Sequence, residues 1–89
     1  MANIVKNCVD TRTFPAICST LTDMEWLELK RRLMTQLMKT EQTILNWKNG
    51  KTFPTDYSVR KEATSIVNRF LGIKTSHLTL FDYERARTS

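Results

Sequence analysis

The side chains that could do chemistry in this chain are short polar groups and cations between residues 39 and 60. Gln42, Thr43 and Asn46 stand close together, with Gln42 and Asn46 four residues apart. Gln can pair with adenine through two hydrogen bonds, and Thr or Asn can reach other base edges or the thymine methyl group. The cations nearby are of the kind that contact phosphate oxygens. These residue types favour binding of a nucleic acid over catalysis.

The chain contains few residues that could act in catalysis or bind a metal ion. The chain has one histidine, His77, and two cysteines, Cys8 and Cys18, which make neither a catalytic triad nor a zinc site. Its two glycines, Gly50 and Gly72, cannot form a glycine-rich phosphate loop. We therefore expect no enzyme activity, no metal, no cofactor and no small-molecule substrate, and we expect both thiols to be reduced.

The charge is concentrated around the same residues. The chain has 89 residues, enough for one domain, and a formal net charge of +5. Residues 28–61 contain eight basic and three acidic side chains, so their local excess equals the whole net charge. A basic excess favours anionic partners. No apolar run is long enough to span a membrane, and the first residues lack a signal pattern, so we expect a cytoplasmic protein.

Hydrophobic spacing predicts four helices that would position these groups. Apolar residues recur at helical intervals over 23–38, where Thr22 and Glu25 form a capping box. A shorter helix is predicted over 41–48, with Thr40 as its N-cap, Ile44 and Trp47 facing the core, and Gly50 after its end. A short helix over about 15–20 precedes these two. A fourth, beginning near 55–58, ends at 71 before Gly72.

The two ends of the chain are predicted to lie outside the helical domain. Residues 1–13 form an N-terminal arm, 14–73 the helical domain and 74–89 a C-terminal extension. Leu78 and Leu80 alternate with Thr79, which indicates either a short strand or an extended segment over 78–81. If it is a strand, it would pair with residues 4–9. The predicted fold class is all-α: a small bundle of four to five helices containing a helix-turn-helix, with this terminal β pairing added.

The segment from Met34 to Pro54 resembles the Cro/XRE-type, phage-repressor-like helix-turn-helix family. The family pattern is apolar-x-x-x-Leu-x-x-Ser/Thr-x-x-Thr-Ile-x-x-Trp-x-x-Gly-Lys-x-x-Pro, which aligns Leu33, Leu37, Thr40, Ile44, Trp47 and Gly50. The resemblance covers about residues 33–72. Three positions depart from it: Met34, where Ala is usual; Met38, where Gly is common; and Lys39, where an apolar residue is usual.

The resemblance implies a small transcriptional regulator that binds double-stranded DNA as a homodimer. Helix 41–48 would enter the major groove, where Gln42, Thr43 and Asn46 would read bases. The phosphates would be held by Lys39, Thr40, Lys48, Lys51 and Arg60. Segment 78–81 and the outer face of helix 58–71 would be candidate dimer surfaces. The alternative is a helical protein–protein interaction module without DNA reading. A single-stranded RNA binder is a third possibility, although no exposed pair of stacking aromatics is evident.

Overall fold

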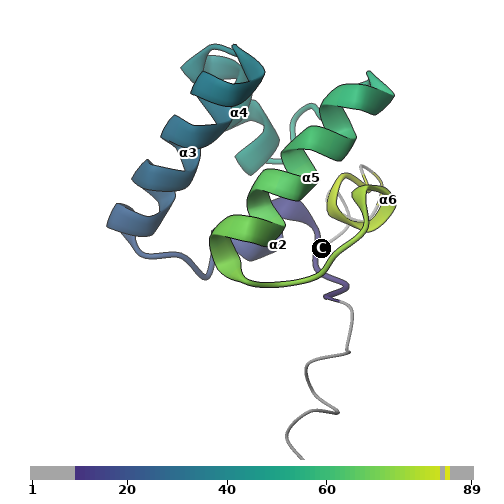
Figure 1. The fold of residues 1–89 in the computed structure, drawn as a ribbon, viewed down its shortest axis with the longest axis horizontal. Coiled ribbons are helices and arrows are strands. Elements are labelled where there is room, and N and C mark those ends of the chain that lie inside the picture. Colours follow the sequence, from purple (N-terminus) through teal and green to yellow (C-terminus); the bar gives the residue numbers. More distant parts are fainter. Residues whose placement is uncertain (1–9, 83, 85–89) are drawn as a thin grey trace, which may run out of the picture.

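Five helices make up the part of the chain that the computed structural model describes, which is residues 10–82 and 84. They are α2 (Phe14–Cys18), α3 (Asp23–Leu37), α4 (Glu41–Lys48), α5 (Tyr57–Leu71) and α6 (His77–Leu80). The two long helices, α3 and α5, pack against each other. The short helix α4 contacts α2 and α3, and α6 lies beside α5 (Figure 1). The prediction of a small all-α bundle is confirmed.

Helix ends follow the capping residues identified in the sequence. The Thr22 hydroxyl accepts a hydrogen bond from the Glu25 backbone N–H at 3.2 Å, and the Glu25 carboxylate accepts one from the Thr22 N–H at 2.9 Å. Asp56, a cap that was not predicted, lies at the start of α5 and accepts from the Ser58 N–H at 2.8 Å. Gly72 ends α5 with a φ of 66°, in the left-handed region where a Cβ is unfavourable. Local hydrogen bonding therefore fixes where α3 and α5 begin and end.

The core is centred on aromatic rings from both ends of the described chain. Phe81, which follows α6, has its ring centroid 5.8 Å from Phe14, 5.8 Å from Trp47 and 5.4 Å from Phe53. Aliphatic side chains of α3, α4 and α5 fill the space around this cluster, namely Leu29, Leu33, Ile44, Ile66 and Val67. The segment after α5 is thus part of the same core as the helices before it.

The predicted strand over 78–81 is wrong, because residues 77–80 form the single turn of α6. The Ser76 hydroxyl caps this turn by accepting from the Leu78 N–H at 3.1 Å. Leu80 and Phe81 are adjacent and both buried, whereas Leu78 is 67% exposed. This burial is incompatible with the period of two that a strand requires. The proposed pairing partner, residues 4–9, lies outside the described residues.

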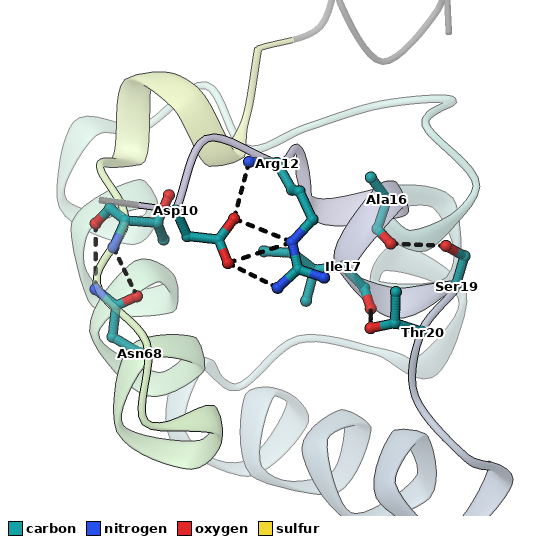
Figure 2. Close-up of polar contacts among 8 residues, drawn as sticks. Asp10, Arg12, Ala16, Ile17, Ser19, Thr20 and Asn68 are labelled. Carbon is teal, nitrogen blue, oxygen red and sulfur yellow. Dashed lines mark hydrogen bonds and ion pairs between the residues drawn. The ribbon is translucent and has the colours of Figure 1, made fainter. Parts of the chain in front are cut away.

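The residues before α2 contact the loop between α5 and α6. The Asp10 backbone N–H donates to the carbonyl oxygen of Lys74 at 2.6 Å. The Asp10 carboxylate faces the Arg12 guanidinium, with Nη2 2.7 Å from Oδ2 and Nε 3.0 Å from Oδ1 (Figure 2). These charge-assisted hydrogen bonds lower the pKa of Asp10 below its ordinary value. Residues 10–13 of the predicted arm are therefore joined to the helical domain.

Candidate nucleic-acid interface

A three-residue turn separates α4 from α3. Helix α3 ends at Leu37, Met38 takes a left-handed conformation with a φ of 54°, and Thr40 is the N-cap of α4. Two helices joined by a turn of this length have the connection of a helix-turn-helix. The predicted bounds of the short helix, 41–48, agree with the structure.

The inner face of α4 attaches it to the core. Ile44 and Trp47 are buried, as their spacing predicts. Gly50 follows the helix with a φ of 74° and lets the chain turn away. On the N-terminal side, the Lys30 ammonium of α3 lies 2.7 Å from the Glu41 carboxylate. An apolar anchor and an ion pair thus fix the orientation of α4 relative to α3.

The outer face of α4 presents amide side chains. Gln42 and Asn49 are exposed and Asn46 is half-buried. At spacings of four and three residues, these side chains form one stripe along the helix. The Gln42 Nε2 donates to the Asn46 Oδ1 at 3.1 Å, so the two amides are already aligned. Asn49 was not among the predicted base contacts, although its spacing from Gln42 and Asn46 is the signal that would have identified it.

The two threonines at the start of α4 face each other. The Thr40 Oγ1 accepts from the Thr43 backbone N–H at 3.3 Å and lies 3.0 Å from the Thr43 Oγ1. Thr43 and Lys39 also line a shallow depression of about 240 Å³ beside the loop that precedes α5. Thr52, Thr55 and Asp56 complete its polar lining. The two loop threonines could not be predicted from the sequence, because loop residues carry no periodicity.

Three basic residues of α3 form ion pairs with carboxylates of segment 28–61. Arg31 and Arg32 lie 3.6 Å and 3.1 Å from the Glu28 carboxylate. Lys30 pairs with Glu41, as described above. Two of the three acidic residues of the segment are therefore matched by cations of α3, and the third, Asp56, caps α5. The other basic residues of the segment are Lys39, Lys48, Lys51, Arg60 and Lys61.

The four predicted phosphate-binding cations have different surroundings. Lys39 is exposed, and its ammonium has no hydrogen-bond or ion-pair partner in the described part of the chain. The Lys48 ammonium lies 4.9 Å above the centroid of the Trp26 ring, a cation–π contact. Lys51 is exposed, just beyond the end of α4. The Arg60 Nε donates to the Pro54 carbonyl, and its guanidinium retains further N–H donors.

Beneath α4, Cys18 is fully enclosed. Burial raises the pKa of its thiol to about 12, and the nearby charge of Lys48 opposes this only in part. The thiol is therefore neutral at physiological pH and packs as a small apolar group.

Comparison with protein-family models, curated proteins and solved structures finds no match. Within residues 10–82 and 84, no helix has the length and apolar character needed to cross a membrane. Nor do those residues contain a group of three potential metal ligands from His, Cys, Asp and Glu.

Proposed function

We propose that this chain binds double-stranded DNA by placing α4 in the major groove. The observation that carries the proposal is the geometry of α4. It is a separate helix anchored through Ile44 and Trp47, with its amide stripe directed away from the core. A helix presented in this way can enter a groove about 12 Å wide. The proposed role is binding, as a small cytoplasmic transcriptional regulator, rather than catalysis.

The aligned pair of Gln42 and Asn46 is suited to reading base edges. Because Gln42 uses one Nε2 hydrogen on Asn46, its second hydrogen and its Oε1 are available for adenine N7 and N6. The Asn46 Nδ2 can donate to the next base. Thr43 is half-buried at the edge of the stripe, where its methyl group can meet a thymine methyl.

Phosphate contacts would come from both sides of this stripe. Lys39 and Thr40 lie before α4, and Lys48, Lys51 and Arg60 lie at or after its end. The cations of α3 already paired with Glu28 and Glu41 are not included. If four cations contact phosphates, the logarithm of the binding constant should fall with the logarithm of the salt concentration, with a slope between about −3 and −4.

The proposed homodimer has fewer surfaces than the sequence suggested. Because Leu80 and Phe81 are buried, Leu78 is the exposed apolar side chain that segment 78–81 offers to a partner. Tyr57 of α5, whose ring centroid lies 5.1 Å from that of His77, is also exposed. Sedimentation velocity across a concentration series would test the dimer. A chain that stays monomeric on a palindromic DNA site would exclude it.

The test of DNA binding is fluorescence anisotropy with a labelled random duplex at low and moderate salt. Lys39→Ala should weaken binding about equally on all sequences. Gln42→Ala should change the preference among sites by about 1–3 kcal/mol. Lys74→Ala is the matched charge control, because the α5–α6 loop lies at the end of the molecule away from the α3–α4 turn (Figure 1). Lack of salt-sensitive binding by the parent chain at low salt would rule out the proposal.

A protein-interaction module is the second candidate. Met24 and Leu27, one turn apart on α3, are 76% and 50% exposed. Leu45 of α4 is half-buried and so contributes less apolar surface. A bound partner lost on Leu27→Glu, together with no DNA binding, would favour this candidate.

A further inference from the structure

A polar pocket of about 300 Å³ lies between α5 and the loop that leads into α6. Its lining includes Lys61, Ser65, Asn68, Thr75 and His77, and it contains no carboxylate. None of its residues belongs to α4 or is among the residues assigned to DNA phosphates, so the pocket is distinct from the surface assigned to DNA. A pocket with a cation, hydroxyls and an amide, and without a carboxylate, has the chemistry that recognises a small anion.

The Thr75 hydroxyl is the observation that points to a ligand. Thr75 is 8% exposed, and its Oγ1 is buried without a hydrogen-bond partner among the described residues. Buried hydroxyls nearly always have a partner, because an unpaired one loses its interaction with water and gains nothing. Thr75 also lines the pocket, so rotation of its buried hydroxyl toward an acceptor oxygen seated there would supply the missing hydrogen bond.

Two further groups keep donors available for such an oxygen. The Lys61 ammonium lies 5.3 Å from the centroid of the Tyr57 ring and is not paired with a carboxylate in the described residues. Ser65 accepts only a long contact, 3.5 Å from the Arg69 Nη2, so its hydroxyl hydrogen can donate elsewhere. Together with Thr75, they place a charge and two hydroxyl donors around one volume.

The loop side of the pocket is held in place before any ligand binds. The Asn68 Oδ1 accepts from the Thr75 backbone N–H at 3.1 Å, and its Nδ2 donates to the Thr75 carbonyl at 3.2 Å (Figure 2). The carbonyl of neighbouring Lys74 accepts from the Asp10 N–H at 2.6 Å. A loop fixed by these bonds loses little entropy on binding, which favours affinity.

We propose that this pocket binds a small oxyanion of the phosphate class, either inorganic phosphate or the phosphoryl group of a small phosphomonoester. Several donors around one volume suit an anion that presents several acceptor oxygens. The volume is larger than a single phosphate needs, and this leaves room for a small organic group on a phosphomonoester. The proposal does not depend on DNA binding, so either one can fail without the other.

Thermal unfolding of the full chain tests the pocket, with inorganic phosphate and glycerol 2-phosphate compared with sodium chloride at equal ionic strength. At a ligand concentration about ten times Kd, the midpoint should rise by roughly 5–10 °C above the chloride control. Lys61→Gln should abolish most of this rise. Lys74→Gln removes the same charge from a residue outside the pocket, and this variant should still show the rise in midpoint. Thr75→Val, which preserves shape, should also abolish it.

Amide chemical-shift mapping locates the bound anion. Shifts at Lys61, Ser65 and Thr75 that are lost in Lys61→Gln support the proposal. No stabilisation beyond chloride would overturn it, as would equal responses of Lys61→Gln and Lys74→Gln. Shifts confined to α4 would assign phosphate to the proposed DNA face and would also overturn it. If Thr75→Val is more stable than the parent but responds equally to phosphate, the hydroxyl has no role in binding and the proposal fails.

Discussion

Met38 is the one non-glycine residue within residues 10–82 and 84 that has a positive φ. Its φ of 54° places it in the left-handed region, and its side chain is 89% exposed. A Cβ in that region costs roughly 1–2 kcal/mol. Met38→Gly should therefore stabilise the chain by about 0.5–1 kcal/mol, after allowing for the greater flexibility of glycine when unfolded. Urea unfolding measures the change. Met38→Ala, which keeps the Cβ, should give no such gain, and a loss of stability in Met38→Gly would contradict the assigned conformation.

Cys18 is predicted to be unreactive in the folded chain. With a pKa of about 12, its thiolate population near pH 8 is about a thousandfold below that of a thiol with the ordinary value of 9.0. In a Cys8→Ser background, labelling of Cys18 should be slow in buffer and fast in urea. Because the folded pKa is raised, the contribution of Cys18 to stability is complete below pH 9 and decreases as pH rises toward 12. Equal labelling rates in the two conditions would place the thiol at the surface.

At the scale of elements, the ion pair between Lys30 and Glu41 gives Glu41 a structural role. Its carboxylate is 2.7 Å from the Lys30 ammonium and lies in the first turn of α4, where a negative charge is favourable. Glu41→Gln should lower the free energy of unfolding by less than about 1 kcal/mol, because the pair is partly exposed. The same change removes a negative charge from the proposed DNA face and releases Lys30. DNA affinity should therefore rise, by up to about fivefold.

Glu62→Gln is the matched control for Glu41→Gln, because Glu62 is an exposed acidic residue on α5. It should change DNA affinity less than Glu41→Gln does. Lower affinity of Glu41→Gln, limited to sites with a particular cytosine, would instead show that Glu41 reads a base, as a carboxylate can.

The sequence predicted those elements whose boundaries depend on local interactions. Thr22 with Glu25, Thr40, and Gly72 each act through hydrogen bonds or backbone geometry within a few residues, so α3, α4 and α5 could be located. The exposure of Gln42 followed from the burial of Ile44 and Trp47 on the opposite face.

Features set by tertiary contacts could not be read from the sequence in this way. Leu78 and Leu80 alternate with Thr79 as in a strand, but capping by Ser76 and burial of two consecutive residues made the segment helical. The pairing of Lys30 with Glu41, 11 residues apart in the sequence, could likewise not be predicted, since side-chain geometry decides which charges meet. The pair of Arg32 with Glu28, in contrast, has the i, i+4 spacing that a sequence indicates. The charge count of segment 28–61 therefore included cations of α3 that are engaged with carboxylates.

At the scale of the whole molecule, Phe81 joins the two ends of the helical domain. Its ring packs against Phe14, Trp47 and Phe53, which come from α2, from α4 and from the loop before α5. A ring that contacts this many elements makes their stability interdependent, so we expect the described helices to unfold as one cooperative unit. The surface that presents Gln42 and Asn46 thus depends on a residue distant from it in sequence.

Phe81→Ala tests this dependence. Removing a fully buried ring costs about 3–5 kcal/mol, a large fraction of the roughly 5–15 kcal/mol that stabilises a small domain. The variant should be mostly unfolded or strongly destabilised, and urea unfolding followed by tryptophan fluorescence should show it, since Trp47 adjoins the lost ring. Leu78→Ala, at a neighbouring exposed position of α6, should change stability by less than about 0.5 kcal/mol. A stable Phe81→Ala chain, with fast hydrogen exchange confined to residues 77–80, would mean that α6 is an independent appendage and that α4 does not need it.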